Sequence, residues 1–265
     1  MPTTKVYKPT DRQAIMAEEI ISAMEAMKDD RQRAILCRFF KTGKGQYGEG
    51  DQFLGLKVPL TRLVVKEARL RVGMDEIEQL IYSPWHEVRL AGFLLLVEEM
   101  NASLPRRGAD SPESAIRRRE IAGFYLRHAH QANNWDLVDL SAPYIIGRWI
   151  LHPDENGDMP DRHILDLLTA SDNLWLQRIG IVATLALIRE RQCGDTLRIV
   201  SSLLYHRHDL IHKAMGWMLR EVGKKDVAEL LDFLDAYYTK MPRTTLRYAI
   251  ERLPEPQRQY WLRRK

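Results

Sequence analysis

The sequence predicts an all-α protein built as a solenoid, in which antiparallel helix pairs stack on one another. Three observations predict this fold class. Apolar residues recur at helical spacing along most of the chain. No stretch shows the alternation of apolar and polar residues, bounded by turns, that marks a half-buried strand. Finally, several of the expected helices share one pattern, a basic residue followed by a dense apolar run, and part of this pattern recurs at intervals of about 35 residues.

The repeated pattern begins at four basic residues, Arg89, Arg178, Lys213 and Arg247. The last three lie 35 and 34 residues apart. Helix pairs at such a period carry apolar faces that only neighbouring pairs can bury, so they stack into a curved solenoid. If the repeats are in register, the four residues recur at the same place on successive helices. They would then give the concave face of the solenoid a positive charge, which suits the backbone of a DNA duplex. The alternative is that they form salt links between neighbouring repeats.

Glycines follow the basic residue in three of the four units, at Gly92, Gly180 and Gly216. Glycine inside a helix costs about 0.5–1 kcal/mol relative to alanine. We therefore expect neighbouring helices to approach closely at these three positions.

The composition limits the number of domains, the kind of partner and the cellular compartment that the sequence allows. The chain has 265 residues, 45% of them hydrophobic and 29% charged, which suits a single domain spanning residues 1–265. The net charge of +4 permits a polyanionic partner. Two distant cysteines, Cys37 and Cys193, argue against a disulfide scaffold or a cysteine zinc site. The longest apolar stretches are too short to span a bilayer and the N-terminus lacks a signal-peptide core, so we expect a soluble cytoplasmic protein with no membrane partner.

The N-terminal half is expected to begin with a loose arm, residues 1–10, and a helix capped by Thr10 or Asp11. Residues 41–55 contain five glycines and form a loop, either a flexible connection or a site where Lys41, Lys44 or backbone amides contact phosphate. Pro59 opens the next helix, and residues 101–113 form a polar linker. Helices are expected over residues 11–29, 31–40, 59–71, 74–82, 84–100 and 113–132.

The central stretch, residues 133–147, reads NNWDLVDLSAPYIIG. Trp135 and Asp139 are four residues apart, so a helix places both side chains on one face. Asn133 or Asn134 can cap this helix, and Pro143 ends or kinks it. After a turn-rich loop at 152–161, helices are expected over residues 161–170, 173–190, 194–205, 209–223, 225–239 and 243–252, followed by a short arginine-rich tail.

Three short motifs carry a resemblance to a known family. They are WDLVD at 135–139, SDNLWLQR at 171–178 and IHKAMGWMLRE at 211–221. In this order, with repeats between them, they make residues from about 30 to 252 resemble the AlkD-type DNA alkylation repair glycosylases, which are built of HEAT-like repeats. The resemblance implies a monofunctional glycosylase that removes N3- and N7-alkylated purines from double-stranded DNA in base excision repair.

The resemblance also implies roles for five residues. Asp139 matches the aspartate that serves the chemistry, and Trp135 and Trp217 match tryptophans that pack on the backbone at the lesion. Arg178 and Arg220 match positions that would hold phosphates. The loop KTGKGQYGEGD departs from the family pattern and a tyrosine of some relatives aligns with Phe39, so no N-terminal contact is carried over. The protein would be nucleoid-associated when bound to DNA.

The chemistry of the lesion agrees with these roles. Alkylation at N7 or N3 makes the purine cationic and a good leaving group, and its departure leaves oxocarbenium character at C1′. An anion near that carbon, Asp139, can stabilise the developing charge and orient the attacking water. Arg178 and Arg220 would fix the register through phosphates. The residues do not decide whether the base is flipped into a pocket.

Two other classes of function remain open. One is a non-catalytic HEAT-like protein that binds branched or damaged DNA, and the other is an α-solenoid scaffold for proteins. His206, His208 and His212 have a spacing that could face a metal, but histidines beside a loop are more often solvated, so we expect no metal. No cofactor motif is present, and a solenoid that wraps a duplex is expected to act as a monomer.

Overall fold

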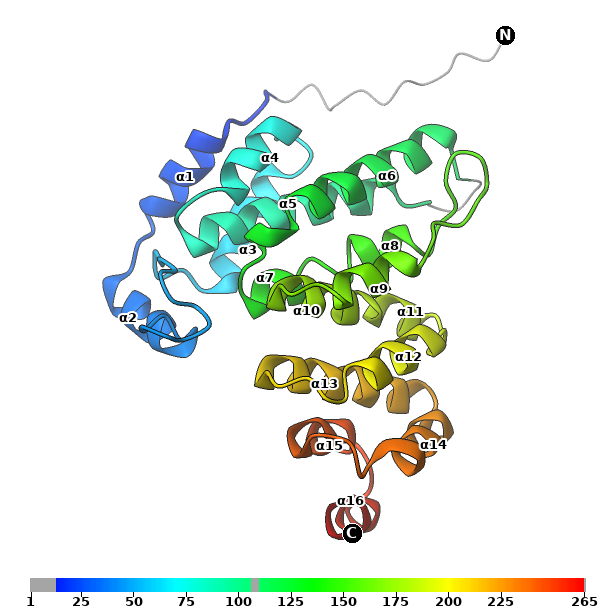
Figure 1. The fold of residues 1–265 in the computed structure, drawn as a ribbon. Helices are drawn as coiled ribbons and strands as arrows, with labels where there is room; N and C mark the ends of the chain where they lie inside the picture. The colour runs from blue at the N-terminus through cyan, green and yellow to red at the C-terminus, as the bar shows by residue number, and fades with distance from the viewer. Residues whose placement is uncertain (1–12, 106–109, 265) are drawn as a thin grey trace. The chain divides into compact units, whose positions relative to one another are not determined.

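Figure 1 shows a computed structural model of the chain, which describes residues 13–105 and 110–264. Within these residues the regular structure is helical, and the only β feature is an isolated bridge between Gln52 and Trp85. The predicted all-α class is therefore confirmed. The expected arm at residues 1–10 lies outside the described residues.

The contacts group the chain into two compact units. Unit 1 comprises Met1–Leu104 and Gln131–Leu137, and unit 2 comprises Pro105–His130 and Val138–Lys265. The boundary thus crosses the central stretch of the sequence. The single domain expected from composition stays a prediction.

Unit 1 is built around one long helix, α5, with α1, α3 and α4 packed against it. The apolar run of α5, from Val88 to Val97, is buried on all sides, as expected for a helix that is apolar all round. Helix α2, in contrast, contributes no buried residue of its own. The bounds are α1 Ala17–Glu25, α2 Asp30–Phe39, α3 Val58–Ala68, α4 Met74–Ile81 and α5 His86–Ser103.

Unit 2 is a series of stacked helices. Helix α9 pairs with α10, α10 packs on α13, and α13 packs on both α14 and α15. This succession of packed pairs is the arrangement that the repeat predicted. The bounds are α6 Pro112–Arg127, α8 Ile146–Trp149, α9 His163–Thr169, α10 Leu174–Ala183, α11 Leu185–Arg189, α12 Gly194–Ser202, α13 Asp209–Lys225, α14 Val227–Tyr237, α15 Arg243–Ala249 and α16 Glu255–Arg263. A short 3-10 helix, Ala129–Gln131, and α7, Trp135–Asp139, each contain a boundary between the two units.

Several boundaries differ from the sequence prediction. The first helix, expected from residue 11 with a cap at Thr10 or Asp11, begins at Ala17 with Met16 at its N-cap and ends at Glu25. The helix expected over 173–190 is divided at Thr184, whose hydroxyl donates to the carbonyl of Ile181 at 2.6 Å and competes with the helical bonds. Helix α5 runs to Ser103, so the expected linker begins later. The arginine-rich tail forms α16, which the buried Trp261 anchors.

The predicted close approach at the three glycines is confirmed. A Cβ at Gly92 would lie 2.9 Å from Ile81 Cγ1 on α4, and a Cβ at Gly180 would lie 2.6 Å from Thr169 Cγ2 on α9. At Gly216 it would overlap Tyr248 on α15. In each case a larger residue would push apart two packed helices.

The second half of the glycine-rich loop is not a flexible connection. The carboxylate of Glu87 accepts the backbone N–H groups of Leu54, Gly55 and Leu56 at 2.9, 2.9 and 3.0 Å. Phe53 and Leu54 are buried. The physical reason is the buried carboxylate at the start of α5. It accepts hydrogen bonds from three backbone N–H groups that would otherwise be buried without a partner. In the first half, Lys41 and Lys44 are exposed, and their contact with phosphate stays a prediction.

Gly55 offers a test of this anchor. It has a φ of +97°, and an added Cβ would collide with the carbonyl oxygen of Asp29. Gly157 has a similar φ of +91° but open space around it. Both alanine variants would carry backbone strain, and only Gly55→Ala would also carry the collision, so we expect it to lose about 1–3 kcal/mol more stability than Gly157→Ala. Urea unfolding of the two variants measures the difference, and equal losses would show that the loop can move away from Asp29.

Candidate functional site

The central stretch forms the short helix α7, Trp135–Asp139, as the sequence predicted. Asn134, one of the two expected capping residues, accepts the backbone N–H of Trp135 at 2.9 Å. The helix ends before Pro143, and turns follow it up to α8. The boundary between the two units crosses α7 after Leu137, so Trp135 belongs to unit 1 and Asp139 to unit 2.

In unit 2, Asp139 forms a two-point ion pair with Arg178 of α10. Arg178 Nε donates to Asp139 Oδ1 at 2.9 Å and Nη2 donates to Oδ2 at 2.8 Å. The remaining terminal nitrogen, Nη1, donates to the carbonyl of Leu210 at 2.6 Å. The Arg178 side chain is buried, whereas 15% of the Asp139 side chain is exposed. This geometry fixes the direction of the carboxylate and favours a positioning role for Arg178 over the predicted phosphate contact.

A buried tyrosine adjoins the same carboxylate. Tyr125 of α6 is fully buried, and its hydroxyl lies 2.9 Å from Ser141 Oγ. Burial raises the pKa of Tyr125, and the negative charge of Asp139 raises it further. The Tyr125 phenol therefore stays neutral, and of these two side chains only the Asp139 carboxylate carries a negative charge.

In unit 1, Trp135 is half-buried against two phenylalanines that follow one another at the end of α2. Its ring is stacked on Phe40 with a centroid distance of 5.3 Å and an interplanar angle of 16°. Phe39 meets it edge-on at 5.8 Å. Phe40 in turn stacks on Phe53 of the glycine-rich loop at 5.1 Å. Such pairs contribute about 0.5–1.5 kcal/mol beyond area burial, so they hold the indole in one orientation.

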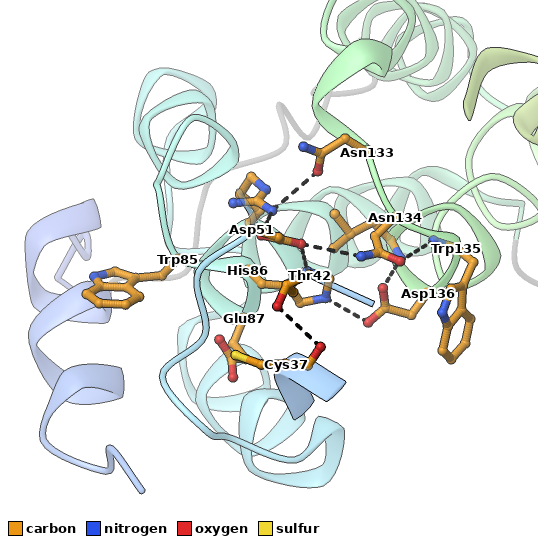
Figure 2. A network of polar contacts seen from close by, with 12 residues as sticks. Cys37, Thr42, Asp51, Trp85, His86, Glu87, Asn133, Asn134, Trp135 and Asp136 are labelled. Atoms are coloured by element: carbon orange, nitrogen blue, oxygen red, sulfur yellow. Dashed lines mark hydrogen bonds and ion pairs between the residues drawn. The ribbon is translucent and has the colours of Figure 1, made fainter. Parts of the chain in front are cut away.

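A buried polar network lies next to this stack (Figure 2). His86 lies between two aspartates: Nδ1 is 2.7 Å from Asp51 Oδ2, and Nε2 is 2.9 Å from Asp136 Oδ2. Arg89 Nη2 lies 2.5 Å from the other oxygen of Asp51. Asn134 Nδ2 also donates to Asp51, at 3.4 Å. The network joins the glycine-rich loop, the start of α5 and the first turn of α7 within unit 1.

His86 is positively charged in this network. Both ring nitrogens face carboxylate oxygens, and only the imidazolium can donate from both. Burial opposes the charge, but the neighbouring Asp136 and Asp51 outweigh burial and raise the pKa of His86 to about 9. Burial alone would raise the pKa of Asp51, but His86 and Arg89 lower it. Two anions and two cations therefore balance one another in the interior.

The remaining predicted site residues lie one turn apart on α13. Trp217 is half-buried. Arg220 forms an ion pair with Glu251, and its Nε lies 3.7 Å from Glu221 Oε1. Among the five predicted side chains, Asp139 and Arg178 are joined by direct hydrogen bonds.

The predicted row of basic residues is wrong for two of its four members. Arg89 and Arg178 are buried and paired with Asp51 and Asp139, so the salt link is the correct alternative for them. Lys213 pairs with Asp209 at 2.7 Å, and Arg247 is exposed. The cause is burial, because the start of an apolar helix lies in the interior, where a cation needs a carboxylate partner.

Comparison with known proteins identifies the family. Residues 20–253 match the family model of the DNA alkylation repair enzyme. The chain belongs to the DNA alkylation repair enzyme family. Membership supports an enzymatic role in the repair of alkylated DNA, and it confirms the resemblance carried by the three motifs.

A solved structure shows a similar fold. It is described as a predicted DNA alkylation repair enzyme from Enterococcus faecalis, and it is 15% identical to this chain. The likeness covers 86% of this chain and 97% of that one, with a TM-score of 0.59. At this level of identity it supports the fold alone. No protein with a curated description matches the chain.

Sequence reasoning missed the buried network of this DNA alkylation repair family member. Of its members, Arg89 and Asn134 were singled out, Arg89 as part of the repeated basic pattern and Asn134 as a helix cap. A signal was present, because His86, Glu87 and Arg89 directly precede the apolar run of α5 from Leu90 to Val97. Such a helix is buried, and charged residues within it must find partners. The partners themselves, 35 and 50 positions from His86, could not be read from the pattern.

Two further findings concern ligands and membranes. In the described part of this family member, no group of three or more histidine, cysteine, aspartate or glutamate side chains is placed to hold a metal ion. Over the same residues, no helix combines the length and the apolar character that crossing a bilayer requires.

Proposed function

We propose that this DNA alkylation repair family member is a monofunctional glycosylase, which releases N3- and N7-alkylated purines from double-stranded DNA. The observation that supports this most is the Asp139–Arg178 pair. A partly exposed carboxylate, oriented through both oxygens by a buried guanidinium, lies in the motif where the resemblance expects the catalytic group.

Asp139 is the proposed catalytic residue. When a cationic purine departs, the bond between its nitrogen and C1′ breaks and positive charge develops on the sugar. A carboxylate held in place stabilises that charge without reorganising, and it can orient the water whose oxygen then bonds to C1′. Arg178 keeps the carboxylate in one direction. Each carboxylate oxygen can accept more than one hydrogen bond, so the ion pair is compatible with a contact to water.

Trp135, Trp217 and Arg220 are the proposed DNA-binding residues. The stack on Phe40 holds the Trp135 indole firmly, so its exposed part offers a rigid surface to deoxyribose at little entropic cost. Arg220 is a better phosphate ligand than Arg178, because its partner Glu251 is exposed and an exposed ion pair contributes little. A DNA phosphate can replace that partner.

The reaction needs only duplex DNA and water, so we propose a monomeric enzyme without a cofactor. The test uses a duplex that contains one N7-methylguanine. Release of the free base, leaving an abasic site in an uncut strand, is the expected result, and an unmethylated duplex is the control. Salt-sensitive DNA binding without base release would support the non-catalytic DNA-binding protein instead. Absence of both would support the protein scaffold.

A further inference from the structure

The loop between α12 and α13 presents two exposed side chains on a firmly held backbone. Leu203 and Leu204 are buried and anchor its beginning. The next residue, Tyr205, is 76% exposed, the largest exposure of any big apolar side chain in the described residues. Arg207 is also exposed, whereas the histidines that alternate with these two residues are half-buried. The loop therefore turns an aromatic ring and a guanidinium outward.

The inward-facing histidines form a hydrogen-bonded support. His206 Nδ1 accepts the backbone N–H of His208 at 3.0 Å, and His208 Nδ1 accepts that of Leu210 at 3.2 Å, which caps α13. The ring nitrogen Nε2 of His212 lies 2.5 Å from the carbonyl of His206. A ring nitrogen that accepts a backbone N–H cannot carry a proton, so His206 and His208 are neutral in this arrangement. Burial and the neighbouring histidines lower the pKa of His206, and burial also lowers the pKa of His208.

This support connects the loop to the proposed catalytic pair within unit 2. His206 Nε2 lies 2.9 Å from Oε1 of Gln177, the residue directly before Arg178 on α10. Arg178 itself donates to the carbonyl of Leu210, at the start of α13. The middle of the loop, at His206, and the first turn of α13 that follows the loop are therefore both bonded to the turn of α10 that orients Asp139.

The charges around the loop favour a polyanion. Asp209, the nearest acidic residue in the sequence, is neutralised by Lys213 at 2.7 Å, and Lys213 lowers the pKa of Asp209. The two histidines are neutral. Arg207 therefore leaves a net positive charge at the exposed tip. Neither Tyr205 nor Arg207 makes a hydrogen bond or ion pair within the described part of the chain.

We propose that Tyr205 and Arg207 form a contact to duplex DNA beside Asp139. Arg207 binds a backbone phosphate, and the ring of Tyr205 packs on the sugar and base of a nucleotide close to the lesion. The proposal rests on the proposed glycosylase function. An aromatic side chain next to an arginine is the combination that nucleic-acid surfaces use, one for stacking and the other for phosphate. Because the histidines hold the loop in one conformation in the free protein, the loop loses little conformational entropy on binding DNA.

The experiment measures binding to a fluorescent duplex over a series of salt concentrations. For Tyr205→Ala we expect about 5- to 150-fold weaker binding with an unchanged salt slope, because a stacking contact is lost. For Arg207→Ala we expect the slope of log K against log salt to become shallower by about 0.9, the value for one phosphate contact. Tyr205→Phe keeps the ring and should bind like wild type. Tyr260→Ala and Arg252→Ala, both at exposed positions of unit 2, are the matched controls.

Two results would overturn the proposal, and only the second would also overturn the glycosylase proposal. In the first, Tyr205→Ala and Arg207→Ala each bind as tightly as the two controls while wild type releases N7-methylguanine. In that case the loop is not a DNA contact, and the glycosylase proposal stands. If wild type neither binds duplex DNA nor releases the base, the glycosylase proposal fails and the loop contact fails with it. Thermal unfolding of each variant shows that a loss of binding does not come from a loss of fold.

Discussion

Replacing Asp139 by asparagine is expected to slow the release of N7-methylguanine by about 10²–10³-fold, the typical effect of removing one group that stabilises charge in a transition state. Asparagine has nearly the same shape, and its amide oxygen can still accept from Arg178. The negative charge is lost, however, and the developing cation at C1′ loses its stabilisation. Duplex binding should persist, because it depends on phosphate contacts elsewhere. Single-turnover release and a binding titration measure the two properties separately.

The control for this substitution is a carboxylate on the same unit with no part in the proposed site. Asp172 is exposed, and Asp172→Asn should release the base like wild type. Because asparagine leaves the buried Arg178 without an anion, thermal unfolding must show that Asp139→Asn is folded at the assay temperature. Undiminished release by a folded Asp139→Asn would remove this residue from the chemistry.

A second large effect is expected from the buried network of unit 1. Replacing His86 by glutamine removes the cation that separates Asp51 from Asp136, and it leaves two buried carboxylates with Arg89 as their remaining charged partner. Breaking a buried ion pair costs about 3–5 kcal/mol, and we expect a loss of this size in urea unfolding. His163→Gln, at an exposed histidine, should cost much less. Equal losses in the two variants would mean that the network does not stabilise the fold.

The pH dependence of stability distinguishes the charge of His86 from its packing. Its pKa is about 9 in the folded protein, above the ordinary value of 6.5. Between pH 6.5 and about pH 9, His86 is therefore protonated in the folded state and deprotonated in the unfolded state. The stabilisation is complete below about pH 6.5 and is lost as the pH rises through 9, by at most about 1.4 kcal/mol per pH unit. His86→Gln should lack this decline, and a decline as steep as that of wild type would assign it to other groups.

The sequence by itself determined the class of fold and most of the helices, because the periodicity of apolar residues is a local property of the chain. It also predicted why Gly92, Gly180 and Gly216 stand inside helices, since only close packing offsets the cost of glycine there. The short motifs were sufficient to select Asp139 and Arg178 as residues of one site and to indicate the family.

Only the tertiary structure decided what those side chains bond to. Arg178 is 39 residues from Asp139, and their ion pair depends on how α10 packs, which a local pattern does not contain. The same holds for His86, whose partners come from the glycine-rich loop and from α7, and for Glu87, which turns the end of that loop from a flexible connection into an anchored one. Burial explains these differences: a charge placed in the interior must find a partner there, and the fold determines which residue is near enough to serve.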